Sequence, residues 1–411
     1  MTPTDPAAVS PEVLFTQLAL PRLTLKNRLI RSATYEGWGD ANGFPRRELG
    51  DLYLELARGG VGAIITGFVF VSRAGRAMQR GQCGIDADDK IPAWRAIVSR
   101  VRESCPDVRL IMQLAHAGRQ TRQEVTGLPV AGVSSRPCTY FRQRVRVVDD
   151  AAIRGIVEEF GSAARRARDA GFDGVEIHAA HGYLVHQFLS PWTNNRQDDW
   201  GRPERFLQEV IRAIHRTCGS GFPVLVKVSA AESSRPGIRV EDTVRTVKSL
   251  EGLGVDAVEV STGTMEYALN IIRGNCPVDL VLAVNPLFQR IPAFARRIWK
   301  ILFAGAYLRH LIPFSEGYNV DAAEQVKRNT SLAVIPVGGI RRVETMVDCV
   351  AGRGLDAVAL CRPLICEPDL PMKLQAGPAR RSRCCNCNLC TIYCDSPRTV
   401  QCYQRKNGET S

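Results

Sequence analysis

Hydrophobic residues in this chain gather into eight short runs separated by amphipathic segments. Each run is almost continuously apolar, which is typical of parallel strands that are covered on both faces. Amphipathic helices are predicted between the runs, and the clearest spans 151–170 and ends at Gly171, a residue favoured at helix C-termini. The eight predicted strands are 29–33, 62–68, 108–114, 174–178, 223–229, 255–260, 332–337 and 356–361.

Eight strands that alternate with helices predict an α/β fold, a (β/α)8 TIM barrel. A doubly wound open sheet is the competing interpretation, but the strand count and the absence of a GxGxxG motif after the first strand favour the barrel. Two stretches interrupt the alternation: an insertion at about 263–316, after the sixth strand, and a cysteine-rich tail. We therefore expect a barrel over 1–376 and a separate tail over 377–411. The remaining predicted helices are 48–59, 91–104, 203–218, 241–253, 319–329 and 343–353.

The composition excludes several classes of protein. The chain has 411 residues, of which 45% are hydrophobic and 23% charged, so a large folded core is expected. The net charge of +12 is scattered rather than clustered, which argues against a nucleic-acid partner. The N-terminus lacks the pattern of a signal peptide, and no apolar run reaches the roughly 18 residues of a membrane span. These features predict a cytoplasmic protein with reduced thiols.

Polar residues follow several of the predicted strands, where barrels place their catalytic groups. Gln113 offers an amide that suits a heterocycle with adjacent C=O and N–H groups. Lys227 is a cation on an inward-facing strand, where it would be costly unless it faced developing negative charge. His178 and His181 can donate to a carbonyl oxygen, and Tyr183 can supply a proton. Each residue taken alone has an ordinary structural interpretation, so the argument depends on the whole set in its order along the strands.

The last two strands end in groups that suit an anion. Gly338 and Gly339 follow the seventh strand, and Cys361 and Arg362 follow the eighth. Barrels commonly bind phosphate at this place, through backbone N–H groups and a guanidinium. A Gly-Gly pair before a helix is also a common turn, which is the alternative interpretation.

Five segments together make the chain resemble the old yellow enzyme family of FMN-dependent oxidoreductases. The resemblance covers nearly the whole barrel, its most specific part follows the fourth strand, and the fold it implies agrees with the strand count. The segments are KNRLIRSAT (26–34), IMQLAHAGRQ (111–120), VEIHAAHGYLVHQFLSPWTNNRQDDWG (175–201), VIPVGGI (334–340) and DAVALCRPL (356–364).

The resemblance implies a role for each matching position. Tyr183 would protonate the substrate carbon, while His178 and His181 would hold its carbonyl oxygen or a nicotinamide amide. Lys227 stands where many members have Arg, near the flavin pyrimidine. The positions that would contact FMN are Ser32, Ala33, Thr34, Gly67, Gln113, Lys227, Gly338, Gly339, Cys361 and Arg362.

The implied reaction has two halves. NAD(P)H would reduce the flavin, which would then reduce the β-carbon of an α,β-unsaturated carbonyl compound while Tyr183 protonates the α-carbon. Phe68 stands where the family usually has Gly or Ala, and Tyr35 and Glu36 also depart from its pattern. These departures weaken any inference about the shape of the substrate pocket.

Six of the fourteen cysteines lie between Cys384 and Cys402. Cys384, Cys387 and Cys390 have the C-x2-C-x2-C spacing of an iron–sulfur loop. The fourth ligand is Cys394 or Cys402, and we favour Cys402 because a single cluster needs a more distant fourth ligand. Structural Zn is the alternative, since four thiolates also suit that metal.

The tail resembles the branch of the family that includes trimethylamine dehydrogenase and 2,4-dienoyl-CoA reductase, which carry a [4Fe-4S] cluster after the barrel. Those enzymes continue into nucleotide-binding domains, whereas this chain ends soon after its last cysteine. We therefore expect a cluster here to be structural or to exchange electrons with a separate protein. An electron-transfer subunit is thus the second functional hypothesis, beside an ene-reductase; a degenerate barrel that only binds is the third, and the intact residue set argues against it.

The insertion carries basic and aromatic residues without any acidic residue between 280 and 315. A lid that shapes the substrate pocket is the preferred interpretation. The alternative is peripheral contact with a membrane through 286–315. The sequence leaves self-association into an oligomer open.

Overall fold

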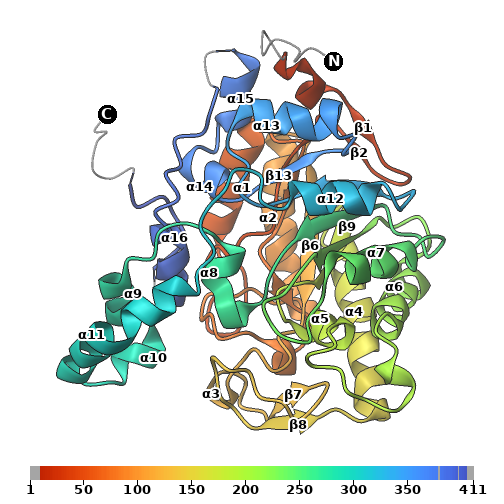
Figure 1. The fold of residues 1–411 in the computed structure, drawn as a ribbon. Helices are drawn as coiled ribbons and strands as arrows, with labels where there is room; N and C mark the ends of the chain where they lie inside the picture. The colour runs from red at the N-terminus through yellow and green to blue at the C-terminus, as the bar shows by residue number, and fades with distance from the viewer. Residues whose placement is uncertain (1–9, 378–379, 397, 405–411) are drawn as a thin grey trace.

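The computed structural model describes residues 10–377, 380–396 and 398–404. Eight parallel strands form a sheet in the order β12-β11-β10-β9-β6-β4-β3-β13, and a ninth strand, β5 (Val69–Phe70), pairs with β6. A bridge between Val337 and Ala359 joins the two ends of this order, so the sheet closes into a barrel (Figure 1). The predicted TIM barrel is therefore confirmed.

All eight predicted strands are present, with ends that differ from the prediction by a few residues. Helices pack around them, and the longest is α4 (Asp150–Asp169), whose N-cap Asp149 accepts a hydrogen bond from the N–H of Ala152. The barrel strands are β3 (Leu29–Arg31), β4 (Ala63–Ile65), β6 (Arg109–Ala115), β9 (Gly174–Ala179), β10 (Val224–Ser229), β11 (Ala257–Ser261), β12 (Ala333–Pro336) and β13 (Val358–Leu360). The outer helices are α1 (Arg47–Arg58), α2 (Ile91–Ser104), α4, α6 (Arg205–Cys218), α7 (Val240–Lys248), α12 (Val320–Lys327), α13 (Val343–Val347) and α14 (Arg362–Cys366).

The two faces of the barrel strands bury different residues. Outward side chains such as Val226 and Ile177 join the large core that packs against the helices. Inward side chains such as Leu225 and Ile111 form a smaller core with the N-terminal hairpin β1 (Leu18–Ala19) and β2 (Thr24–Leu25). Because side chains alternate along a strand, every second residue faces the interior. The hairpin fills the N-terminal end of the barrel and leaves the C-terminal end for polar groups.

Short elements surround the mouth of the barrel. Strands β7 (Val130–Gly132) and β8 (Val145–Val147) pair with each other in the loop after β6. Helix α5 (Leu184–Leu189) follows directly after the predicted catalytic segment. The short elements of the whole fold also include α3 (Gln123–Thr126), α15 (Leu370–Gln375), α16 (Leu389–Ile392), the 3-10 helices at 11–15, 73–75, 88–90, 199–201, 265–267 and 393–395, and a π-helix at 348–352, and not all of them lie at the mouth.

The insertion after β11 lies beside the barrel and projects away from it (Figure 1). Its longest helix, α11, keeps only Ala304 buried, so this helix is not the lid that the sequence led us to expect. The first part of the insertion does reach the mouth. Met265 packs in one apolar cluster with Tyr183, and Asn285 donates to the Tyr140 hydroxyl and to the Asp395 carboxylate. The insertion helices are α8 (Ala268–Ile271), α9 (Val278–Val284), α10 (Pro286–Gln289) and α11 (Ala293–Arg309). No helix in the part of the chain that the structure describes is long and apolar enough to cross a membrane.

Candidate functional site

A layer of ionisable side chains crosses the barrel interior near its C-terminal end. Lys227 on β10 is 2% exposed and its Nζ lies 2.9 Å from Glu259 Oε1 on β11 and 3.8 Å from Glu176 Oε2 on β9. Ser32 bridges the pair, accepting from Lys227 Nζ at 2.9 Å and donating to Glu259 Oε1 at 2.5 Å. Gln113 Nε2 donates to Glu176 Oε2 at 2.5 Å. Three predicted site residues therefore share one buried network with two carboxylates.

This layer holds two carboxyl groups for one ammonium. Burial raises the pKa of Glu176 to about 8, and the Glu259 carboxylate adds to that rise, although Lys227 opposes it. The pKa of Lys227 is raised because the attraction of Glu176 and Glu259 exceeds the opposing effect of burial. The layer therefore retains a proton on Glu176 at neutral pH. The positive charge of Lys227 is already balanced inside the protein.

The three predicted catalytic residues lie together above this layer. The ring centroids of His178 and His181 are 5.0 Å apart, and those of His178 and Tyr183 are 4.9 Å apart. Phe68 packs at 5.4 Å from the Tyr183 ring, so this departure from the family pattern lies directly at the site. His181 has a positive φ of 62°, and its Nε2 lies 2.8 Å from the Ser261 hydroxyl.

Burial sets the protonation of this cluster. It lowers the pKa values of His178 and His181 well below the usual value, and the positive charge of Lys227 lowers both further. Burial also raises the pKa of Tyr183, and the Asp395 carboxylate adds to this rise. At neutral pH the two imidazoles are therefore neutral and the phenol keeps its proton. Two neutral N–H donors beside a protonated phenol can polarise a carbonyl and deliver a proton.

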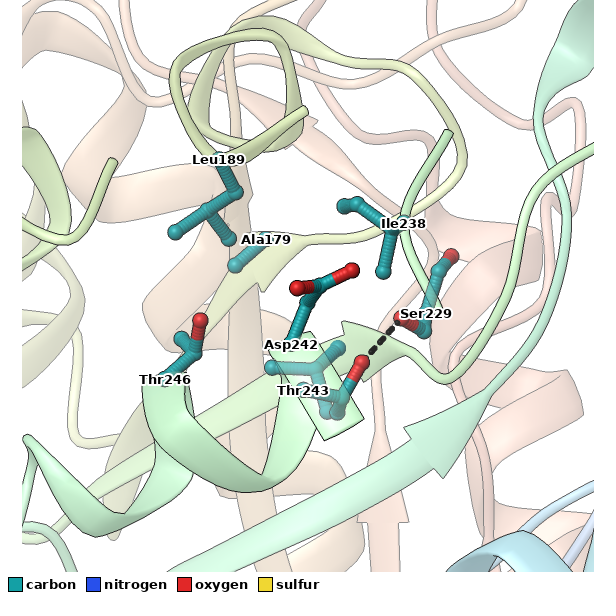
Figure 2. Close-up of a pocket in the computed structure, with 8 residues that line it drawn as sticks. Ala179, Leu189, Ser229, Ile238, Asp242, Thr243 and Thr246 are labelled. Atoms are coloured by element: carbon teal, nitrogen blue, oxygen red, sulfur yellow. Dashed lines mark hydrogen bonds between the residues drawn. The ribbon is translucent and has the colours of Figure 1, made fainter. Parts of the chain in front are cut away.

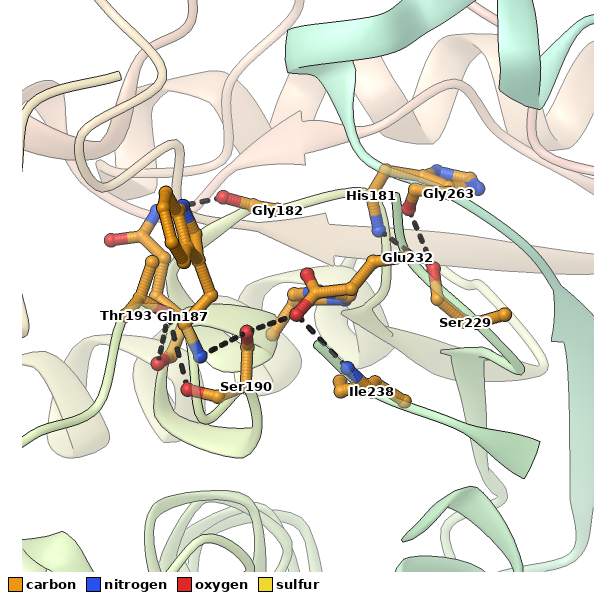
Figure 3. A network of polar contacts seen from close by, with 12 residues as sticks. His181, Gly182, Gln187, Ser190, Thr193, Ser229, Glu232, Ile238 and Gly263 are labelled. Carbon is orange, nitrogen blue, oxygen red and sulfur yellow. Dashed lines mark hydrogen bonds and ion pairs between the residues drawn. The ribbon is translucent and has the colours of Figure 1, made fainter. Parts of the chain in front are cut away.

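A second network holds the loop that carries these residues. Glu232 accepts from the Ser190 hydroxyl and from the N–H of Ile238, and it lies 3.0 Å from His186 Nε2 (Figure 3). The N–H of His181 donates to the Ser229 hydroxyl, which donates in turn to Gly263 O. Burial alone would raise the pKa of Glu232, but these hydrogen bonds lower it. Glu232 thus stays ionised and fixes the segment after β9 against the loop after β10.

A small pocket lies close to this network but on the other face of the strands (Figure 2). Ala179 and Val228, which point outward, line it together with Thr243 and Thr246 of α7. Thr243 Oγ1 donates to Ser229 O at 2.9 Å, so the helix is tied to the strand end. This pocket lies between the strands and helix α7, on the side of the strands that faces away from the catalytic cluster.

The residues that the sequence predicts to bind phosphate lie at the ends of β12 and β13. Gly338 and Gly339 have φ values of 131° and 73°, in the region that favours glycine. A Cβ on Gly338 would lie 2.6 Å from Asn319 Nδ2. Arg362 begins α14, and its guanidinium donates to Asn388 Oδ1 of the tail at 2.6 Å.

The tail brings the four predicted cysteine ligands to the lining of one small pocket. Cys384, Cys387, Cys390 and Cys402 all line it, and Arg362 lines it as well. Cys394 does not line this pocket; its thiol donates to Cys390 O at 3.3 Å. In the part of the chain that the structure describes, no three His, Cys, Asp or Glu side chains are arranged to hold a metal ion. The sulfur atoms are thus gathered without forming a finished metal site.

Sequence reasoning missed four residues that complete these sites. Glu176 and Glu259 complete the charged layer, and Glu232 orients the catalytic loop. Asp395 of the tail lies at the mouth, where it accepts from Asn285 and Gln79, and burial raises its pKa to about 6. Alternation along the strands could have revealed the first two, since Glu176 and Glu259 share the inward phase of His178 and Ser261. No local signal marks Asp395, which is remote in sequence from the barrel.

The sequence matches the NADH:flavin oxidoreductase / NADH oxidase family over residues 13–279. The chain belongs to this family. By family it is an enzyme, an FMN-dependent NAD(P)H oxidoreductase, and the resemblance to old yellow enzymes is confirmed.

Individual relatives agree on the fold and differ in length. The chain is 30% identical to an NADH oxidase of Thermoanaerobacter brockii, over 94% of this chain and 54% of that protein. A 2-naphthoyl-CoA reductase structure superposes with a TM-score of 0.78 at 20% identity, over 94% of this chain and 56% of that one. The old yellow enzyme homologue of Zymomonas mobilis superposes with a TM-score of 0.69 at 21% identity, over 90% and 94% of the two chains. The chain thus spans about half the length of the first two proteins and nearly all of the third.

The family's cofactor fits the residues that the structure places at the mouth. In the described part of the chain, Glu176 Oε1, Glu259 Oε2 and His178 Nδ1 are buried without a hydrogen-bond partner. The Gln113 amide lies beside them, and Gly339 with Arg362 lies at the strand ends where a phosphate would bind. A flavin ring with a phosphate tail presents the matching donors and acceptors.

Proposed function

We propose that the chain reduces α,β-unsaturated carbonyl compounds with electrons from NAD(P)H, using FMN held at the barrel mouth. The observation that carries this proposal is the close packing of His178, His181 and Tyr183 in complementary protonation states. Bound FMN would supply the hydride chemistry, which no side chain of the cluster can perform. The substrate class remains part of the proposal, since the family contains several activities.

The protein groups act on the substrate by position and charge. Neutral His178 and His181 would donate to the carbonyl oxygen and stabilise the charge that develops there. Tyr183 would give its proton to the α-carbon, and its raised pKa keeps that proton available at neutral pH. Glu232 would act as a positioning residue, because it orients the segment that carries all three.

The cofactor residues are proposed at the predicted positions. Gln113 would bind the pyrimidine edge of the flavin, next to backbone groups of Ser32, Ala33, Thr34 and Gly67. Gly338, Gly339, Cys361 and Arg362 would bind its phosphate. Lys227 would lie near the flavin pyrimidine, and Glu259 balances its charge. We therefore expect weaker stabilisation of an anionic reduced flavin than an unpaired cation would give.

We further propose that Cys384, Cys387, Cys390 and Cys402 hold a [4Fe-4S] cluster, with Zn as the alternative metal. The presence of Cys402 in the shared pocket, and the different direction of Cys394, support this choice of fourth ligand. All fourteen cysteines are free thiols, which supports a reducing compartment such as the cytoplasm.

One observation favours a second candidate function, electron transfer to a partner protein. Arg362, the proposed phosphate residue, lines the cysteine pocket and donates to Asn388 within it. The proposed flavin and cluster sites therefore share a side chain. Electrons could pass from one to the other and on to a separate protein.

The first experiment identifies the cofactors. The chain is purified without oxygen, its absorption spectrum is recorded, and released chromophore and metal are analysed. We expect FMN together with about four irons per chain, the content of one cubane cluster. Zinc in place of iron would overturn the cluster, and failure to bind FMN after reconstitution would overturn the enzyme proposal.

A second experiment separates the two candidate functions. Tyr183→Phe should slow alkene reduction by about 100-fold or more and leave reduction of the flavin by NAD(P)H unchanged. Stopped-flow absorbance measures the two half-reactions separately. Tyr140→Phe is the matched control, since this tyrosine contacts Asn285 rather than the histidines. Equal rates for Tyr183→Phe and the wild type in alkene reduction would exclude Tyr183 as the proton donor and favour electron transfer.

A further inference from the structure

Helix α11 exposes an apolar surface that nothing else in the described chain covers. Phe294 is 70% exposed, Ile301 is 73% exposed and Leu302 is 63% exposed. Such residues are normally scattered singly on a protein surface, whereas here they share one projecting helix (Figure 1). A concentration of this kind marks a surface that meets an apolar partner.

Most of the exposed apolar residues lie along one face of the helix, while Phe303, which is 53% exposed, lies on the other. With 3.6 residues per turn, Phe294, Ile298, Ile301, Leu302 and Leu308 fall within an arc of about 120°. The opposite face carries Trp299, which packs against Phe288 of α10 with ring centroids 5.3 Å apart. The helix is therefore anchored to the insertion by one face and presents the other to its surroundings.

The charged residues that α11 itself places along this face are basic. Arg297 lies at the edge of the apolar arc and Arg309 lies at the C-terminal end of the helix. Arg290, which precedes the helix, lies 3.9 Å from Glu124 Oε1. No Asp or Glu occurs between residues 280 and 315. Lys300 points elsewhere, since its ammonium pairs with Asp279 of α9 at 2.6 Å. The exposed surface is therefore apolar in its middle and cationic at its border.

We propose that α11 docks the protein in the surface of a membrane that contains anionic lipids. The apolar arc would enter the boundary between headgroups and acyl chains, while Arg297 and Arg309 would reach the lipid phosphates. The 17-residue helix would lie in the plane of the membrane, which its length suits. This role is independent of the proposed flavin chemistry.

Charge decides between this occupant and a second copy of the chain. Two α11 helices that paired through their apolar arcs would bring arginines together, and the segment offers no carboxylate to neutralise them. An anionic lipid surface removes that repulsion and attracts each arginine that lies near it. The same surface covers the exposed aliphatic side chains.

Co-sedimentation with vesicles tests the proposal on the full chain. Vesicles of phosphatidylcholine with about 30% phosphatidylglycerol should bind the protein at low salt, pure phosphatidylcholine should bind it poorly, and salt should weaken binding by screening. Arg297→Gln with Arg309→Gln should lower the affinity by about tenfold or more. Ile301→Ser with Leu302→Ser should lower it to a similar extent.

Matched variants make the outcome decisive. Leu128→Ser with Met372→Ser removes two exposed apolar side chains from other elements and should leave vesicle binding unchanged. Circular dichroism shows that each variant is folded. The absence of binding to anionic vesicles at low salt would overturn the proposal. A dimer in solution that Ile301→Ser with Leu302→Ser dissociates would also overturn it, and would assign the face to a second copy.

Discussion

The barrel interior and helix α11 place residues against their usual solvent preference in opposite ways. The interior buries Lys227 and Glu259 among dry strands, while α11 exposes Phe294 and Ile301 to water. In the interior, every charge has a partner nearby, so the arrangement is stable only as a complete set. On α11, nothing in the described chain covers the exposed apolar side chains, so a separate partner would have to cover them. Such departures from ordinary burial concentrate at functional places.

The same kind of ion pair occurs in both regions and should contribute very differently to stability. Lys227→Met leaves Glu259 buried and uncompensated, and we expect a loss of about 3–5 kcal/mol in the free energy of unfolding. Lys300→Met breaks the exposed pair with Asp279, and we expect a change below about 1 kcal/mol. Urea unfolding of the apoprotein at pH 7 measures both.

A double variant tests the cause of that loss. Lys227→Met with Glu259→Gln removes both charges and should recover a large part of the stability, because no buried charge is left alone. Equal losses for Lys227→Met and Lys300→Met would show that the interior pair is no more desolvated than the surface pair.

Much of the barrel was predictable because its strands are short, apolar and regularly spaced. Gln113 and Lys227 were found because a polar residue in such a run is conspicuous. Their partners Glu176 and Glu259 were missed. Both lie in the same inward phase, but the sequence pattern does not show which carboxylates the barrel brings beside Lys227. The Asp395–Asn285 contact could not be predicted, since it joins a tail and an insertion whose packing no periodicity describes. The family resemblance, rather than spacing, supplied most of the residue roles.

The protonation of Glu176 in the barrel interior should make the free energy of unfolding depend on pH. Its folded pKa of about 8 lies above the ordinary value of 4.5, so the folded state holds this proton more tightly than the unfolded state. The stabilisation is complete below about pH 4.5 and is lost as the pH rises through about 8. Glu176→Gln cannot lose a proton there. Between pH 5 and 9, wild type should therefore lose on the order of 4 kcal/mol relative to this variant.

Comparing the two proteins cancels the other titrating groups. The buried histidines titrate in the same range and act with the opposite sign, since their pKa values are lowered by burial. Urea unfolding of wild type and Glu176→Gln at each pH gives the difference directly. A constant difference from pH 5 to 9 would show that Glu176 is ionised throughout.

The smallest effect on stability is expected from substitutions on helix α11. Ile301→Ser with Leu302→Ser removes side chains that are already in water, so the free energy of unfolding should change by less than about 0.5 kcal/mol per site. Thermal unfolding without lipid measures this. A larger loss would mean that α11 packs against the protein in solution, and the contrast between the two regions would disappear.

The pairing that closes the barrel also sets a timetable for synthesis of the chain. Strand β3 pairs with β13, so Leu29 and Ile30 find their partners Val358 and Ala359 only near the end of translation. At 5–20 residues per second, an early strand would wait on the order of tens of seconds for its neighbour. During that interval β3 presents an unpaired edge, the kind of edge on which other chains can pair. The cysteine tail emerges after β13, so a metal bound by the proposed cluster site would reach it only after all the barrel strands have been made.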